Sequence, residues 1–287
     1  MNKVLNNKAK YIEEDDKYIL KSTDKDIEEL FSYLHSKGFD NIPDIVETSN
    51  EGIKYKYIES KNNDDNLKRL ELSKLLSFLH YKTSYHKDIS KHKYREIYDK
   101  LKEKIEYIEE YYNKLMDKIE MEIYPSPTHY LIERNYSIIL GSINFIKSEI
   151  KRWFRLVENK TKERVSIVNN NPRKEHVIIG DKSYLVNWDN YMVDTPIIDL
   201  YKLYKVDNNY KDFYELYKEY SKNFNLTEEE KKLFFIMISI PPKIEFLDDE
   251  ILNTKIVGDL INYLYKTNEF IKLVNSEKKI NNESNQK

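Results

Sequence analysis

The side chains best suited to chemistry gather between residues 166 and 189, where strand-like runs border a polar loop. The loop contains Asn169-Asn170-Asn171-Pro172. Any tight turn could use these amides, because Asn bonds its own backbone and tolerates left-handed conformations. Carboxylates could hold a divalent cation or accept a proton, whereas an amide offers neither a base nor a negative charge. Taken alone, the loop therefore favours a turn over a catalytic site.

Two motifs after the loop change that interpretation. The first is Tyr184-Leu185-Val186-Asn187-Trp188-Asp189, and the second is Asp194-Thr195-Pro196-Ile197-Ile198-Asp199-Leu200-Tyr201-Lys202. Their order resembles the aminoglycoside phosphotransferase and choline kinase superfamily, where His-Gly-Asp-x-x-x-x-Asn precedes Ile-Asp-Phe/Trp-Asp/Glu. The second motif resembles Asp-x-Pro-x-x-Asp-Leu-x-Lys of the spore-coat, CotS-type branch. The resemblance implies an α+β, protein-kinase-like fold with two lobes.

The positions that would carry catalysis depart from that pattern. In active members the loop Asp accepts the alcohol proton, the Asn five positions on holds magnesium, and the second motif's Asp bridges the metal to the phosphates. Here those positions hold Asn171, His176 and Asn187. The resemblance with degenerate motifs therefore implies a pseudokinase with no catalytic residue and no bound metal. Glu175 or Asp189 remain as substitute ligands in a rearranged site.

Other positions of the resemblance are retained. Asp199 matches an Asp whose implied role is structural, tying the backbone of the catalytic loop. Lys21 lies at the place of the strand lysine that meets nucleotide, with Glu28 or Glu29 in the following helix and a hinge at residues 58–60. An exposed strand lysine with no ligand is the alternative interpretation of Lys21.

The elements that must position these residues follow from periodicity. Lys17 to Lys21 and Ile53 to Ile58 alternate like strands, and Asp24 to Lys37 has helical spacing that stops at Gly38. We therefore expect a small α/β lobe over residues 1–60.

A mainly helical lobe is expected over residues 61–275. Apolar residues three or four apart predict long helices from Tyr94 to Ile119 and from Ile139 to Val157, which form a helical hairpin at residues 93–158. Three further strands are expected at residues 165–168, 177–179 and 184–188, within a degenerate catalytic loop at residues 165–190. Thr227 and Glu230 form a capping-box pattern, and residues 276–287 are expected to be a flexible tail.

Composition narrows the function classes. The 48 basic and 50 acidic residues nearly cancel, so no strong field draws the chain to nucleic acid. Cysteine is absent, and no run is long and apolar enough for a signal peptide or membrane helix. These features predict a cytoplasmic protein without membrane insertion. The spacing of His80, His86 and His92 matches no metal site, and surface positions are expected for them.

Three functions remain open. The first is a pseudokinase that binds an unidentified protein partner as a scaffold, and the resemblance suggests spore-coat or envelope assembly in a low-GC Gram-positive bacterium. The second is an active phosphotransferase that uses ATP and magnesium on an amino-alcohol or sugar hydroxyl. The third is a sensor that binds nucleotide without catalysis. No cofactor is expected for the first.

Overall fold

The computed structural model describes residues 2–6, 9–13, 17–23, 25–207 and 213–284. The chain forms two compact units, each assembled from three segments. Unit 1 comprises Met1–Lys87, Arg164–Val206 and Glu215–Asn225, and unit 2 comprises Asp88–Glu163, Asp207–Tyr214 and Leu226–Lys287. Unit 1 thus groups residues 1–87 with the degenerate catalytic loop, whereas the expected lobes divide at residue 60.

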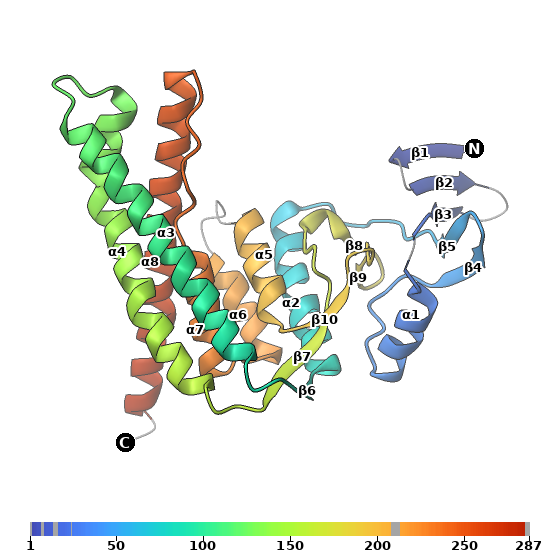
Figure 1. Cartoon of the computed structure of the whole chain (residues 1–287). Coiled ribbons are helices and arrows are strands. Elements are labelled where there is room, and N and C mark those ends of the chain that lie inside the picture. Colours follow the sequence, from blue (N-terminus) through green and yellow to red (C-terminus); the bar gives the residue numbers. More distant parts are fainter. Residues whose placement is uncertain (1, 7–8, 14–16, 24, 208–212, 285–287) are drawn as a thin grey trace. The chain divides into compact units, whose positions relative to one another are not determined.

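Unit 1 begins with a five-stranded antiparallel sheet in the order β1-β2-β3-β5-β4 (Figure 1). The strands are β1 (Asn2–Asn6), β2 (Ala9–Glu13), β3 (Lys17–Lys21), β4 (Ile45–Ser49) and β5 (Gly52–Lys56). The sequence predictions of β3 and β5 are confirmed, although β5 ends two residues before Ile58. The sequence analysis did not predict β1 and β2.

Helix α1 (Ile27–Ser36) follows β3 as expected. Its N-cap is Asp26, whose side chain accepts a hydrogen bond from Glu29 N, and it ends before Gly38, whose φ is +73°. Asp24, where the sequence analysis began this helix, lies outside the described residues. Ile27, Leu30, Phe31 and Leu34 are buried, so the helical spacing does mark the packed face.

The remainder of unit 1 carries the loop region. Its elements are α2 (Asp65–Thr83), β6 (Tyr85–Asp88), β7 (Lys162–Val168), β8 (Val177–Ile179), β9 (Ser183–Leu185), β10 (Met192–Asp194), α5 (Ile197–Asp207) and α6 (Phe213–Asn223). The expected strands at residues 165–168 and 177–179 are confirmed. The expected strand at 184–188 is shorter, because Asn187 has a φ of +65° that no strand allows.

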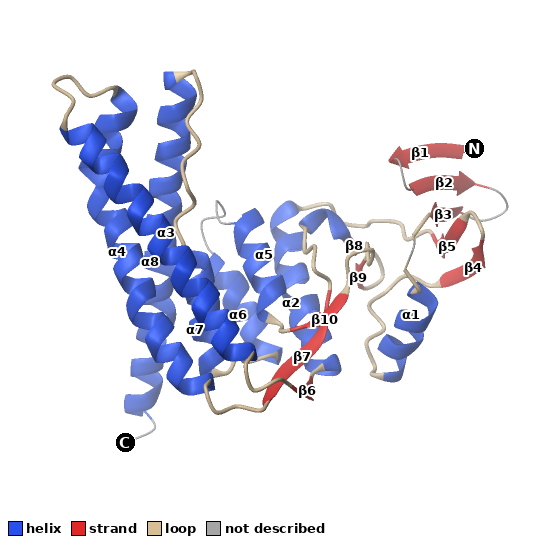
Figure 2. Cartoon of the chain, in the orientation of Figure 1, coloured by secondary structure: helices blue, strands red, loops and turns tan. Residues whose placement is uncertain are grey.

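Unit 2 is helical in its described part (Figure 2). Its helices are α3 (Lys93–Glu120), α4 (Pro127–Val157), α7 (Glu228–Ser239) and α8 (Glu250–Ser284). The predicted hairpin of α3 and α4 is confirmed, and so is the capping box of Thr227 and Glu230 on α7. The predicted tail from residue 276 was wrong in its first part, because α8 stays helical through Ser284.

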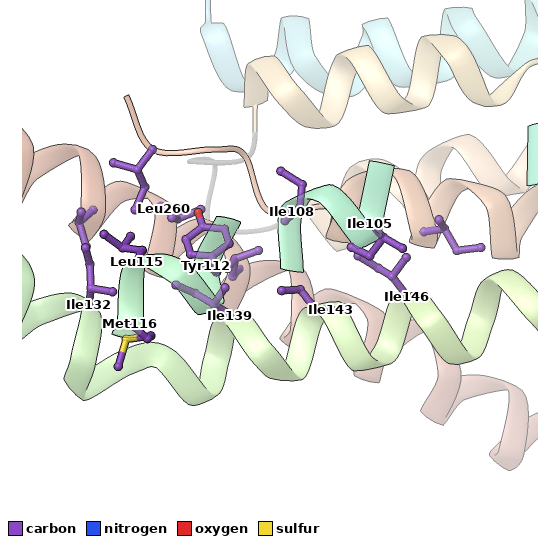
Figure 3. Packing of buried hydrophobic residues seen from close by; sticks show 14 of the residues in the cluster. Ile105, Ile108, Tyr112, Leu115, Met116, Ile132, Ile139, Ile143, Ile146 and Leu260 are labelled. Atoms are coloured by element: carbon purple, nitrogen blue, oxygen red, sulfur yellow. The ribbon is translucent and has the colours of Figure 1, made fainter. Parts of the chain in front are cut away.

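One apolar cluster holds the helices of unit 2 together. Figure 3 shows Ile105, Ile108 and Tyr112 of α3 meeting Ile139, Ile143 and Ile146 of α4, with Leu260 of α8 beside them. All of these side chains are at most 5% exposed. Burial of this stripe supplies the hydrophobic stabilisation of the hairpin. Among the described residues, no helix combines the length and apolar character that a membrane crossing needs.

Candidate functional site

Asp199 binds the backbone of the loop after β7. Asp199 lies in the first turn of α5 and is fully buried. Its Oδ2 accepts a hydrogen bond from Asn169 N at 2.8 Å, and its Oδ1 accepts one from Asn170 N at 2.7 Å. Asn170 has a φ of +61°, so two consecutive amides can point at one carboxylate. These are the backbone contacts that the resemblance assigns to Asp199.

Behind Asp199 lies a buried histidine that the sequence analysis placed on the surface. That expectation for His80 was wrong, whereas His86 and His92 are exposed as expected. His80 Nε2 lies 3.1 Å from Asp199 Oδ2, and its Nδ1 lies 2.6 Å from the Tyr220 hydroxyl. A neutral imidazole satisfies both contacts when Nε2–H donates to Asp199 and Nδ1 accepts from Tyr220. His80 therefore orients the carboxylate that orients the loop.

The three degenerate positions are joined by a chain of hydrogen bonds. Lys21 Nζ donates to Asn187 Oδ1 at 2.7 Å, Asn187 Nδ2 lies 2.8 Å from His176 Nε2, and His176 Nδ1 lies 2.9 Å from the carbonyl oxygen of Asn171. An ammonium can only donate, so the amide oxygen must face Lys21 and the amide NH₂ must face His176. His176 is therefore neutral, with its proton on Nδ1.

Burial keeps His176 in that state. Its pKa is lowered below the usual 6.5, first by desolvation and also by the nearby positive charge of Lys21, while the hydrogen bond to the Asn171 backbone opposes the shift. At neutral pH, His176 Nε2 consequently accepts a hydrogen bond from the Asn187 NH₂ group. The chain from Lys21 to Asn171 is then satisfied at each step without a bound ion.

Lys21 has an anionic partner, Asp189. Its Nζ lies 2.9 Å from Asp189 Oδ2, and both side chains are mostly buried. Glu28 and Glu29 are exposed on α1, and Glu28 accepts a hydrogen bond from Thr48 Oγ1 at 2.6 Å. Neither carboxylate is recorded in contact with Lys21, whose ion pair is with Asp189.

These groups do not fit a magnesium ion. Mg²⁺ prefers several oxygen ligands in octahedral geometry, usually including carboxylates. Here the oxygen of Asn187 is taken by an ammonium, its NH₂ faces the imidazole, and Asp189 is paired with Lys21. Glu175 is exposed on a single 3₁₀ turn. No group of three His, Asp or Glu side chains in the described residues is arranged to hold a metal.

The side chains of this hydrogen-bond chain border a cavity of about 840 Å³. Lys21, His176, Asn187 and Asp189 form its polar end, and Glu175 also borders it. Its apolar lining comes from β3, α1, β5, β8 and the segments around them. The side chains are Ile19, Phe31, Pro43, Tyr55, Tyr57, Ile58, Ile178, Val186 and Trp188. This volume lies within the range of small-molecule sites, and one charged end with an apolar body is typical of them.

Lys202 is a site residue whose role the sequence analysis missed. Its ammonium donates to the carbonyl oxygen of Asn170 at 2.8 Å and to Asn170 Oδ1 at 2.5 Å. The signal was available, because Lys202 closes the Asp-Leu-x-Lys motif that carried the resemblance. Lys21 and Asp189 are far apart in the sequence, so no local sequence pattern could predict their contact. The same holds for His80 and Tyr220, which are 140 residues apart.

Comparisons with solved structures identify the fold of the chain. No family model and no curated protein matches the sequence. Among solved structures, an aminoglycoside phosphotransferase from Alicyclobacillus acidocaldarius superimposes with a TM-score of 0.63 at 8% identity, over 96% of this chain and 92% of that one. The choline kinase LicA from Streptococcus pneumoniae gives a TM-score of 0.45 at 16% identity, over 90% and 91% of the two chains. The fold assignment rests on the first of these.

The chain therefore has the protein-kinase-like α+β fold found in an aminoglycoside phosphotransferase, as the resemblance implied. At 8% identity the similarity concerns fold alone. The chemistry must be argued from the side chains in the cleft.

Proposed function

We propose that this protein is a pseudokinase, which keeps the fold of a phosphotransferase, does not transfer phosphate and acts by binding. One observation carries the proposal: Lys21, Asn187, His176 and the Asn171 backbone form an internally satisfied chain where a phosphotransferase needs acidic oxygen. Phosphoryl transfer depends on positioning and on cations that neutralise phosphate charge. The carboxamide of Asn171 also cannot accept the proton of an alcohol.

The first experiment measures ATP consumption by the full chain with and without magnesium, in the presence of choline or an aminoglycoside. We expect no consumption above a protein-free control. Magnesium-dependent consumption that disappears in Asp189→Ala, but persists in Asp44→Ala on the exposed surface, would establish the active phosphotransferase instead. In that case Asp189 would have left Lys21 to serve as the metal ligand.

A nucleotide-binding role without transfer is the second candidate, and the cavity favours it. Lys21 presents a mostly buried ammonium at one end, and the apolar lining could take a base. Because the residues do not fit magnesium, binding should not need the metal. A thermal-shift assay with ATP or ADP should then give the same rise in Tm with and without magnesium, lost in Lys21→Ala. If millimolar ATP or ADP does not raise the Tm, nucleotide binding is excluded. The remaining function is then binding of a protein partner through the surface.

We propose to seek the protein partner among the components of spore-coat or envelope assembly, since the CotS-type motif supports that direction. The motif is Asp194 to Lys202, of which Asp199 and Lys202 hold the loop. Fractionation of cells into cytoplasm and spore coat would test this localisation. A protein found only in the cytoplasm throughout sporulation would contradict the spore-coat part.

A further inference from the structure

Exposed apolar side chains gather at one end of unit 2. They come from the turn between α3 and α4 with the first turn of α4, and from the loop that leads into α8 with the first turn of α8. Ile123, Tyr124 and Ile251 are 86%, 92% and 80% exposed. The full set, called the tip patch below, is Met121, Ile123, Tyr124, Tyr130, Phe246, Leu247, Ile251 and Leu252.

Contacts between the two segments make the tip patch one surface. Thr128 N donates to Glu250 Oε1 at 2.7 Å, and the hydroxyls of Thr128 and Thr254 lie 2.9 Å apart. The rings of His129 and Phe246 meet edge to face at 6.0 Å. Figure 1 shows the α3–α4 turn and the start of α8 at the same end of the helices. The surface is therefore preformed.

The core of unit 2 is complete without these side chains. Ile119, Ile132, Ile244 and Val257 are buried at this end and belong to the apolar cluster. The residues of the tip patch lie outside that cluster. Single exposed apolar residues need no explanation, but a contiguous group on a soluble surface is a sign of an interaction site.

Charge indicates which partner fits. Arg134 Nη1 donates to the Tyr130 hydroxyl at 3.4 Å, and Lys118, Lys243 and Lys255 also flank the two segments in sequence. The segments 119–132 and 244–254 themselves contain no Lys or Arg. Their carboxylates are Glu120, Glu122, Glu245, Asp248, Asp249 and Glu250. The hydrogen bond from the Thr128 backbone lowers the pKa of Glu250, so this carboxylate stays ionised at neutral pH. Six carboxylates against four flanking basic side chains leave the rim net acidic. A net acidic rim repels an anionic membrane and the same rim on a second copy of the chain.

We propose that the tip patch docks a basic amphipathic segment of a partner protein, with apolar side chains covering Ile123 and Ile251 and with Lys or Arg meeting the acidic rim. The inference goes beyond the proposed function and does not depend on it. An active site in the cleft would leave the tip patch unchanged, and an empty tip patch would leave the cleft argument intact.

The test uses two synthetic helical peptides and the full chain. One peptide carries Leu on one face and Lys on the other, and its counterpart carries Glu in place of Lys. Fluorescence anisotropy should show binding of the basic peptide and no binding of the acidic one. Ile123→Ser with Ile251→Ser should weaken binding about tenfold, as expected when buried interface side chains are lost. Glu245→Gln with Asp248→Asn should weaken binding and reduce its salt dependence.

Matched controls separate specific docking from general effects. Tyr265→Ser with Leu273→Ser removes exposed apolar residues elsewhere on α8 and should leave binding unchanged. All variants should keep the Tm of the parent chain. The proposal is overturned if the basic peptide does not bind, if the serine variant at the tip patch binds it equally well, or if the acidic peptide binds equally well. Dimerisation lost in Ile123→Ser, or binding to anionic vesicles, would assign the surface to those partners instead.

Discussion

Asp199 joins more of the site than a single hydrogen bond would suggest. Its two oxygens serve Asn169 N, Asn170 N and His80 Nε2, all in a buried setting. In Asp199→Asn one end of the side chain becomes a donor that faces an N–H group. We expect a loss of about 3 kcal/mol in the free energy of unfolding, since a buried charged partner is removed. Urea denaturation measures it.

A matched control is Asp44→Asn, which changes an exposed carboxylate elsewhere in unit 1. Its effect should stay within about 0.5 kcal/mol, as for most surface substitutions. Equal and small effects at both positions would show that Asp199 is not what holds the loop.

His176 should make stability depend on pH in a defined direction. Its pKa is lowered in the folded chain, first by burial, so the unfolded chain binds more protons below about pH 6.5. Stability is therefore full above that pH and falls as the pH drops further. In His176→Asn this part of the loss should disappear. The difference in unfolding free energy between the two proteins, measured from pH 8 to pH 5, must then change with pH, and a constant difference would contradict the assignment.

At this scale the sequence located the site residues but not their partners. Motif spacing was enough to find Asn171, His176, Asn187 and Asp199, because these residues lie within one short stretch. The pairing of Lys21 with Asp189 was not predictable, since 168 positions separate them and only the fold brings them together. Glu28 and Glu29 lie on α1, the helix after Lys21, and Glu28 accepts a hydrogen bond from Thr48 on β4.

Helix packing leads to a second kind of prediction. Ile143 is fully buried between α3 and α4, and its neighbours cannot easily fill the space that a smaller side chain would leave. Ile143→Ala should cost about 3 kcal/mol in the free energy of unfolding. Ile123→Ala, at 86% exposure, should change it by less than about 0.5 kcal/mol. Thermal or urea denaturation of both variants tests this, and a comparable loss in Ile123→Ala would make the tip patch part of the core.

Element prediction succeeded where periodicity was long. The apolar stripes of α3 and α4 repeat over many turns, so both helices and their pairing were predictable. Strands β1 and β2 were not, because their sequences NKVLN and AKYIE are only five residues long and too short for a clear alternation. The end of α8 was not predictable either: Asn275 follows Val274, the last residue of the apolar stripe, and is typical of a helix end, yet α8 continues through Ser284.

The balance of charge over the whole chain makes a further expectation testable. With 48 basic and 50 acidic residues, the electrostatic attraction that dominates nonspecific nucleic-acid binding is weak. A labelled DNA duplex should therefore show no mobility shift at physiological salt. A shift that weakens steeply as salt is added would reveal a local basic surface that the net charge of −2 conceals.

The segments of unit 1 are synthesised at different times, because they are far apart in the sequence. Its first segment ends at Lys87, but the rest begins only at Arg164, after the whole α3–α4 hairpin has been made. Lys21 and Asn187 are 166 positions apart, which a ribosome adding roughly 5–20 residues per second covers in roughly 10–30 s. During that interval the complete N-terminal sheet has left the ribosome without the later strands and helices of unit 1. During synthesis the cleft of unit 1 therefore remains incomplete until the segment after Arg164 has been made. We expect chaperones to bind the nascent chain mainly in this period.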